Sequence, residues 1–157
     1  MKSIFPFLVS GVLVFAAAGC ETPSRTSTEA PSNVNEEAKS PAKEAAQTTQ
    51  NDATSDTRKR QIESDIRARE QRNNTTGGDT DRDDADLESE VRGKLEANLP
   101  ASNLTVDSEQ GAVTIAGNVP TQEQLNRIPS LAQEIKGVKS VKVDVKVAPA
   151  TKPSQNN

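Results

Sequence analysis

Apolar and polar positions alternate regularly in one part of the chain, between residues 87 and 147. The pattern begins with Leu87, Val91 and Leu95, which recur every four residues and therefore fall on one face of a helix. This spacing predicts an amphipathic helix over residues 84–97, with the three aliphatic side chains facing a core.

A hairpin of two short strands is predicted next. Residues 104–108 alternate between apolar and polar side chains, and residues 113–119 carry a second alternating run. The three residues Glu109-Gln110-Gly111 predict a tight turn, because glycine takes positive φ angles without steric cost.

A second helix is predicted to follow that hairpin. Thr121 is placed to cap its first turn and Gln124 to complete a capping box, while Gly137 ends it. Pro129 lies inside it and predicts a kink or a break, because proline has no backbone N–H to donate. The buried face of this helix is expected to carry Leu125, Ile128, Leu131, Ala132 and Ile135.

The last strand has the clearest pattern in the chain. Residues 141–147 alternate strictly between valine and charged residues, which predicts one buried and one solvated face. A helical crossover before this strand makes the sheet mixed. We therefore expect an α+β fold, α-β-β-α-β, in which two helices cover one face of a three-stranded mixed sheet.

The chain before this folded part has a different composition. From residue 20 to 83 it is rich in Ser, Thr, Asn, Gln, Glu and Pro, and its large apolar residues are Val34, Ile62 and Ile66. Such a segment buries too little apolar surface to offset the entropy lost on ordering. We expect a long disordered linker or tether there, with one short helix near residues 58–72, and a second disordered segment at residues 149–157.

The first nineteen residues are typical of an export signal. An uncharged apolar run follows Lys2 and is too short to span a bilayer. It ends in Ala18-Gly19-Cys20, which resembles the cleavage box of bacterial lipoproteins. The resemblance implies that the signal peptide, residues 1–19, is removed, that Cys20 becomes the lipid-modified N-terminus, and that Glu21 directs the protein to the outer membrane. The alternative is ordinary cleavage after Ala18, which would leave a soluble protein with one unpaired thiol.

The predicted hairpin and last strand carry glycines in a pattern that resembles a known family. Gly111-Ala-Val-Thr-Ile-Ala-Gly117-Asn-Val is followed by a helix and then by Gly137-Val-Lys-Ser-Val. This order is similar to that of the BON domain family (bacterial OsmY and nodulation) and places the domain at residues 84–148, with Gly111, Gly117 and Gly137 as fold-defining glycines. The resemblance implies the fold α-β-β-α-β and an association with bacterial envelopes and phospholipid membranes.

Composition excludes much catalytic chemistry. The chain has no His, Trp or Tyr, its three Phe residues lie within the first fifteen positions, and Cys20 is its one cysteine. A histidine base, a histidine metal ligand and a Ser-His or Cys-His pair are therefore excluded, and single-stranded nucleic acid would find no ring to stack on in the mature chain. We expect a protein that is not an enzyme, has no cofactor and does not bind nucleic acid.

One acidic segment resembles a calcium-binding loop at several positions. Asp79, Asp81, Asp83 and Glu90 match in spacing, but Asp84 stands where such a loop needs glycine. The alternative is an acidic helix start, in which Asp83 or Asp84 caps the helix and acidic side chains complement its dipole. We favour that interpretation and predict no metal site.

Basic residues gather at the last strand, where residues 136–146 hold four lysines against one aspartate. Each lysine near an anionic bilayer contributes about 1 kcal/mol to attraction. The candidate lipid-binding residues are Lys136, Lys139, Lys142 and Lys146. The alternative is that they protect an edge strand from pairing with another chain. A further cluster, Arg58-Lys59-Arg60, would contact the same head groups or lie on a solvated linker.

Two functions are consistent with these features. The first is a non-catalytic envelope lipoprotein, anchored through Cys20 at the outer membrane and facing the periplasm, whose BON domain binds anionic phospholipid surfaces and supports envelope integrity under osmotic stress. The alternative is a tethered protein-interaction or spacer module that docks another envelope protein.

Overall fold

The computed structural model describes residues 23–76 and 82–149. The predicted signal peptide, Cys20, Asp79, Asp81 and residues 150–157 lie outside the described residues. In chain order the elements are β1 (Ser24–Arg25), α1 (Lys43–Thr54), α2 (Asp56–Thr76), α3 (Asp84–Asn98), β2 (Asn103–Glu109), β3 (Ala112–Val119), α4 (Gln122–Gln133) and β4 (Ser140–Val147).

A sheet with the strand order β1-β2-β3-β4 forms the centre of the fold. β2 and β3 form an antiparallel hairpin, and β4 runs parallel to β3. The predicted α+β class, the hairpin and the mixed sheet are therefore confirmed. The last strand reaches its place beside β3 through α4, as a crossover connection between parallel strands requires.

The predicted number of three strands is wrong, because β1 adds a fourth. Ser24 lies opposite Val106 of β2 in an antiparallel pairing. The next residues extend the contact: Thr26 donates its backbone N–H to Leu104 O, and its hydroxyl oxygen accepts the Leu104 N–H, both at 2.9 Å. β1 is two residues long and has no apolar alternation, so the sequence pattern carries no sign of it.

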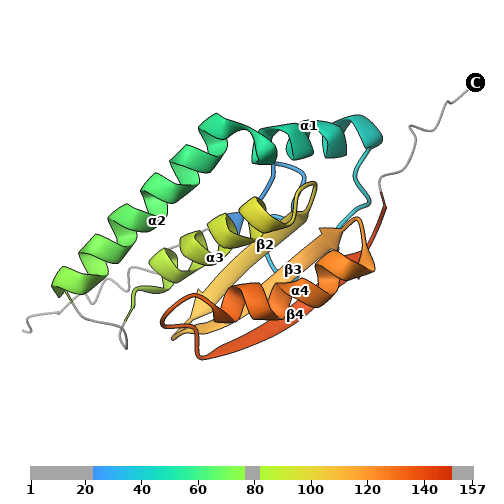
Figure 1. The fold of residues 1–157 in the computed structure, drawn as a ribbon. Helices are drawn as coiled ribbons and strands as arrows, with labels where there is room; N and C mark the ends of the chain where they lie inside the picture. The colour runs from blue at the N-terminus through green and yellow to red at the C-terminus, as the bar shows by residue number, and fades with distance from the viewer. Residues whose placement is uncertain (1–22, 77–81, 150–157) are drawn as a thin grey trace, which may run out of the picture.

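α3 and α4 pack on one face of the sheet, α3 against β2 and α4 against β3 and β4 (Figure 1). The prediction that two helices cover one face is therefore confirmed. The core between them is entirely aliphatic. It contains Val91, Leu95, Leu99, Leu104, Val106, Val113, Ile115, Val119, Ile128, Leu131 and Ala132.

Both predicted helix starts are confirmed, with one difference in detail. Asp83 caps α3, since its carboxylate accepts the Ala85 N–H at 2.9 Å. The Thr121 hydroxyl accepts the Gln124 N–H at 3.3 Å and caps α4. The side chain of Gln124 does not return to close a capping box, because it donates instead to Pro100 O at 3.1 Å.

The predicted break at Pro129 is wrong, since α4 is one helix from Gln122 to Gln133, whereas the kink stays a prediction. Proline removes a single N–H from the helical ladder. The buried side chains of Ile128 and Leu131 lie on either side of it, and their packing on the sheet holds the two turns together. Ile135, expected on the same helix, lies just beyond its end and still packs against the core.

Residues 23–76 differ from the disordered linker that we expected. They contain β1, α1 and α2, and α2 extends beyond the helix predicted near residues 58–72. Ile62 of α2 is 3% exposed and packs against α3 beside Gly93, where an added Cβ would lie 3.2 Å from Ile62 Cγ2. Ile66, one turn further along α2, would lie 4.0 Å from the same Cβ through its Cδ1. Two isoleucines are too few to give α2 the longer apolar stripe that predicts a packed helix.

Candidate functional site

The face of the sheet opposite α3 and α4 is crossed by the N-terminal strap, which we define as residues 26–41 (Figure 1). The Thr105 hydroxyl of β2 donates to Pro31 O, and Asn118 Nδ2 of β3 donates to Lys39 O at 2.7 Å. Thr105 and Asn118 are at most 1% exposed. The strap therefore covers this face along β2 and β3, and hydrogen bonds from strand side chains to strap carbonyls hold it in place.

On β4 the same face is open, which confirms the solvated face predicted for the last strand. Lys142, Asp144 and Lys146 alternate along it and are all exposed. Lys146 donates to Glu37 of the strap at 2.8 Å. This hydrogen bond, together with the opposite charge, raises the pKa of Lys146 and lowers that of Glu37. Both side chains are well exposed, so the pair adds little to stability.

The four candidate lysines do not form one cluster. Lys142 and Lys146 share the open face of β4, whereas Lys139 turns back and donates its ammonium group to Gln110 O at 2.9 Å. Lys136 lies in the loop between α4 and β4, where its carbonyl accepts a hydrogen bond from Arg82 at 2.8 Å. Within the described parts of the chain, the side chain of Lys142 has neither a hydrogen bond nor an ion pair. The structure therefore presents Lys142 and Lys146 as the part of the predicted site that a bilayer could reach together.

The end of the sheet near Lys139 also holds a carboxylate. Asp84, in the first turn of α3, accepts hydrogen bonds from Ser108 Oγ (2.8 Å), Gln110 N (2.7 Å) and Gly111 N (2.9 Å). Burial raises the pKa of Asp84, but these hydrogen bonds and the nearby charge of Lys139 outweigh it, and the pKa is lowered. An ionised Asp84 therefore offsets the charge of Lys139, which weakens that lysine as a contact for lipid.

A buried ion pair lies nearby, since Arg82 lines a pocket together with Asp84 and Lys139. Arg82 and Glu90 bond through their side chains, which are 4% and 3% exposed. Burial raises the pKa of Glu90, although the charge of Arg82 acts against it. The pair borders a cavity of about 270 Å³, which is also lined by Ile66 of α2 and by Glu134 and Lys136. Arg82 and Glu90 therefore neutralise each other at the wall of this cavity.

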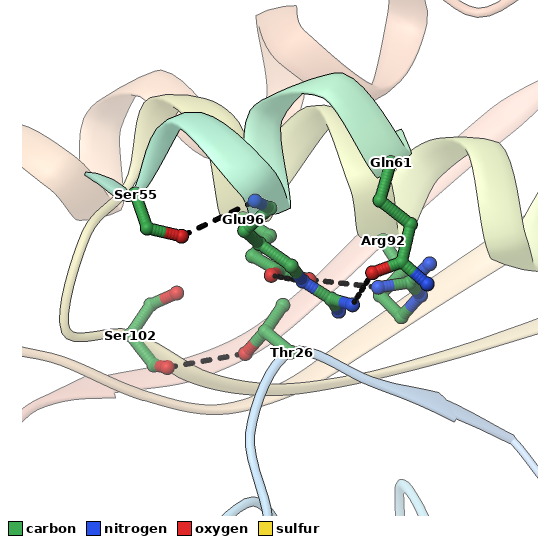
Figure 2. Close-up of polar contacts among 7 residues, drawn as sticks. Thr26, Ser55, Gln61, Arg92, Glu96 and Ser102 are labelled. Carbon is green, nitrogen blue, oxygen red and sulfur yellow. Dashed lines mark hydrogen bonds and ion pairs between the residues drawn. The ribbon is translucent and has the colours of Figure 1, made fainter. Parts of the chain in front are cut away.

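A second buried carboxylate joins α2 to α3. Glu96 is 3% exposed and accepts hydrogen bonds from Arg92 one turn earlier, at 2.7 Å, and from Arg58 Nη2 of α2, at 2.9 Å. Figure 2 shows Glu96 and Arg92, and it also shows Ser55 and Gln61, which accept hydrogen bonds from Arg58. The hydrogen bond to Glu96 raises the pKa of Arg58. Arg58 is therefore removed from the basic cluster that we considered for lipid contact.

Sequence reasoning missed Arg58, Arg82, Glu90 and Glu96 as partners in ion pairs. The spacing of four between Arg92 and Glu96 was a visible signal, because such residues are neighbours on a helix. The pairs of Glu90 with Arg82 and of Glu96 with Arg58 had no such signal. They depend on how the chain before α3 folds back on it.

The described residues contain no group of three or more His, Cys, Asp or Glu side chains arranged to hold a metal ion. Asp83 serves as a helix cap and Glu90 pairs with Arg82, so neither of these two is available to the calcium loop considered above. Within residues 23–76 and 82–149, no helix has the length and apolar content to cross a membrane.

Comparison with known proteins points to one family. Residues 83–149 match the model of a family described as BON domain. Over 60 residues the chain is 40% identical to "Osmotically-inducible protein Y" of Escherichia coli (strain K12), a match that covers 37% of this chain and 30% of that relative. No solved structure matches the chain.

Proposed function

We propose, from the premise that residues 83–149 are a BON domain, that this protein is a non-catalytic lipoprotein of the bacterial envelope. In this proposal Cys20 carries the lipid, the protein faces the periplasm at the outer membrane, and its BON domain binds anionic phospholipid. The name of the relative, osmotically inducible, supports a role in envelope integrity under osmotic stress.

The observation that carries the lipid-binding proposal is the open face of β4. Lys142 and Lys146 project from it on the same side, and both are exposed. Attraction of two such lysines to an anionic surface amounts to about 2 kcal/mol. The exposed ion pair Lys146–Glu37 does not prevent Lys146 from contacting lipid, because ion pairs at the surface are weak and exchange readily with other charges.

The alternative is that the domain docks another envelope protein and that the preceding chain acts as its tether or spacer. One observation favours it: among the described residues β4 is an edge strand, and its backbone has no partner strand on one side. Extended segments of other proteins bind to such edges by adding a strand. The alternative predicts that a partner protein stays bound to the domain after all lipid has been removed.

Vesicle co-sedimentation tests the first proposal. The mature chain from residue 20, with Cys20→Ala to remove the lipid site, is expected to bind anionic but not zwitterionic vesicles, and to lose binding at high salt. The double substitution Lys142→Gln and Lys146→Gln should weaken partitioning roughly 30-fold, from about 1 kcal/mol for each lysine.

A matched control uses the other exposed basic pair. Lys59→Gln with Arg60→Gln changes the net charge equally, on α2. It should leave binding almost unchanged if β4 is the contact. Equal losses in both double variants would show that net charge alone attracts the chain, and no binding to either vesicle would contradict the lipid proposal and favour the protein partner.

The lipid anchor has its own test. In cells, Cys20→Ala is expected to move the protein from the membrane fraction to the soluble fraction, because one aliphatic side chain cannot replace an acyl anchor. The measurement is fractionation of envelopes followed by detection of the full chain. Unchanged membrane attachment of the variant at high salt would contradict lipidation at Cys20.

A further inference from the structure

The outer edge of β4 has no partner strand among the described residues. β4 is eight residues long, whereas the opposite edge of the sheet ends in the two residues of β1. Val147, near the end of β4, is the large apolar side chain that the described structure leaves most exposed, at 39%. A long edge with apolar side chains invites pairing with another strand unless its side chains prevent it.

The order of side chains along β4 is nearly the same in both directions. Read from either end, the central residues are lysine, valine, aspartate, valine and lysine, from Lys142 to Lys146. The three charged side chains point to the open face, and the valines point to the helices. A strand of this kind can lie antiparallel to a second copy of itself, with charges facing charges and valines facing valines.

The register decides whether that pairing attracts or repels. If the two-fold axis passed through Asp144, each aspartate would face its copy and each Lys142 would face a Lys146. If the axis passes through Val143, Lys142 faces Asp144 of the second copy twice, and Val141 faces Val145 twice. Lys146 then faces the uncharged Ser140 at the end of the strand and keeps its contact with Glu37.

We infer that β4 is a self-association surface, on which a second copy of this chain pairs antiparallel about Val143 and continues the sheet across a two-fold axis. The occupant is a second copy because β4 complements itself in charge in this register. The lysines therefore protect the edge selectively: they repel a strand that places a lysine opposite them and accept one that offers an aspartate. This inference does not depend on the proposed lipid binding.

Charge reversal on the open face tests the inference. The mature chain with Cys20→Ala is expected to show a monomer–dimer equilibrium in sedimentation-equilibrium runs over a concentration series. Asp144→Lys should weaken association roughly tenfold, since it turns two attractive pairs into repulsive ones. The double variant Lys142→Asp with Asp144→Lys restores both pairs and should restore the dimer.

Matched controls separate pairing from other effects. Glu109→Lys reverses an exposed charge away from β4 and should leave the dimer intact. Circular dichroism of each variant checks that the fold is retained, as expected for exposed positions. A wild-type chain that stays monomeric at every concentration would overturn the inference, and so would a double variant that fails to recover.

Cysteine cross-linking tests the register. In the Cys20→Ala chain, Val143→Cys would face its own copy, within the Cα separation that a disulfide spans. Val145→Cys lies on the same face of the same strand, but its copy would be about 13 Å away along the strands. Mild oxidation should therefore yield a covalent dimer from Val143→Cys and little from Val145→Cys. Equal yields, or none from Val143→Cys, would overturn this register.

Discussion

Gly117→Ala is expected to destabilise the domain by about 4 kcal/mol or more, or to prevent folding, because it combines two severe effects. Gly117 has φ +133°, a conformation that side chains rarely adopt. A Cβ at this position would also lie 2.1 Å from the backbone oxygen of Asn103 on the neighbouring strand. That oxygen belongs to the first residue of β2, which is paired with Asn118 of β3, and it cannot move away without disturbing this pairing.

Urea denaturation followed by circular dichroism measures this loss. Gly93→Ala is the matched control: Gly93 lies inside α3, and an added Cβ there would meet the end of Ile62 at 3.2 Å, a side chain that can shift. The gain in helix propensity, about 1 kcal/mol, offsets that contact, so we expect a change within about 1 kcal/mol. Similar stabilities for both variants would contradict the strain assigned to Gly117.

Arg82→Met is expected to cost about 3–5 kcal/mol at neutral pH, because it leaves Glu90 charged and buried without its partner. Replacing both residues, as Arg82→Met with Glu90→Met, should recover most of that loss, since a buried ion pair is often no better than apolar side chains of similar volume. Chemical denaturation of the wild type and of both variants measures the difference.

The pH dependence of the same variant gives an independent check. Burial already raises the pKa of Glu90 in the wild type, and removal of Arg82 should raise it further. Because the pKa of Glu90 is raised in the folded state, its contribution to stability is full below the ordinary glutamate pKa of 4.5 and is lost as the pH rises through the folded-state pKa. The gap in unfolding free energy between Arg82→Met and the wild type should therefore narrow on acidification; a gap independent of pH would contradict this account.

The domain at residues 83–149 was predictable from the sequence in most of its parts. Its aliphatic residues repeat every four positions in α3 and every second position in β2, β3 and β4, and these periods place them on one side of each element. The positive φ expected at Gly111 is confirmed, at 81°, and the other two glycines of the pattern also have positive φ angles, Gly117 at 133° and Gly137 at 94°. Where proline suggested a break, burial on both sides of Pro129 overrode the local preference.

The candidate site was less predictable. The sequence grouped four lysines because they are close along the chain, but the structure turns Lys139 toward Gln110 and leaves Lys142 and Lys146 on the open face. Proximity in sequence does not state which side of a strand or loop a long side chain takes. Arg58 shows the same difference, since Glu96, its partner, lies 38 residues away.

For residues 83–149, the sequence by itself determined the order of elements, the aliphatic core and the family. The reason is that side chains facing a core recur at regular short intervals, which neighbouring positions in the sequence show directly. Tertiary structure alone decided how residues 23–76 fold onto that core. The strap is held by carbonyls of Pro31 and Lys39 that accept from Thr105 and Asn118. α2 is held on α3 by Ile62 and Ile66 and by three ion pairs, Arg58–Glu96, Arg69–Asp86 and Arg72–Asp86. Such contacts join backbone groups and single charges far apart in the chain, and they leave no period that a sequence pattern could show.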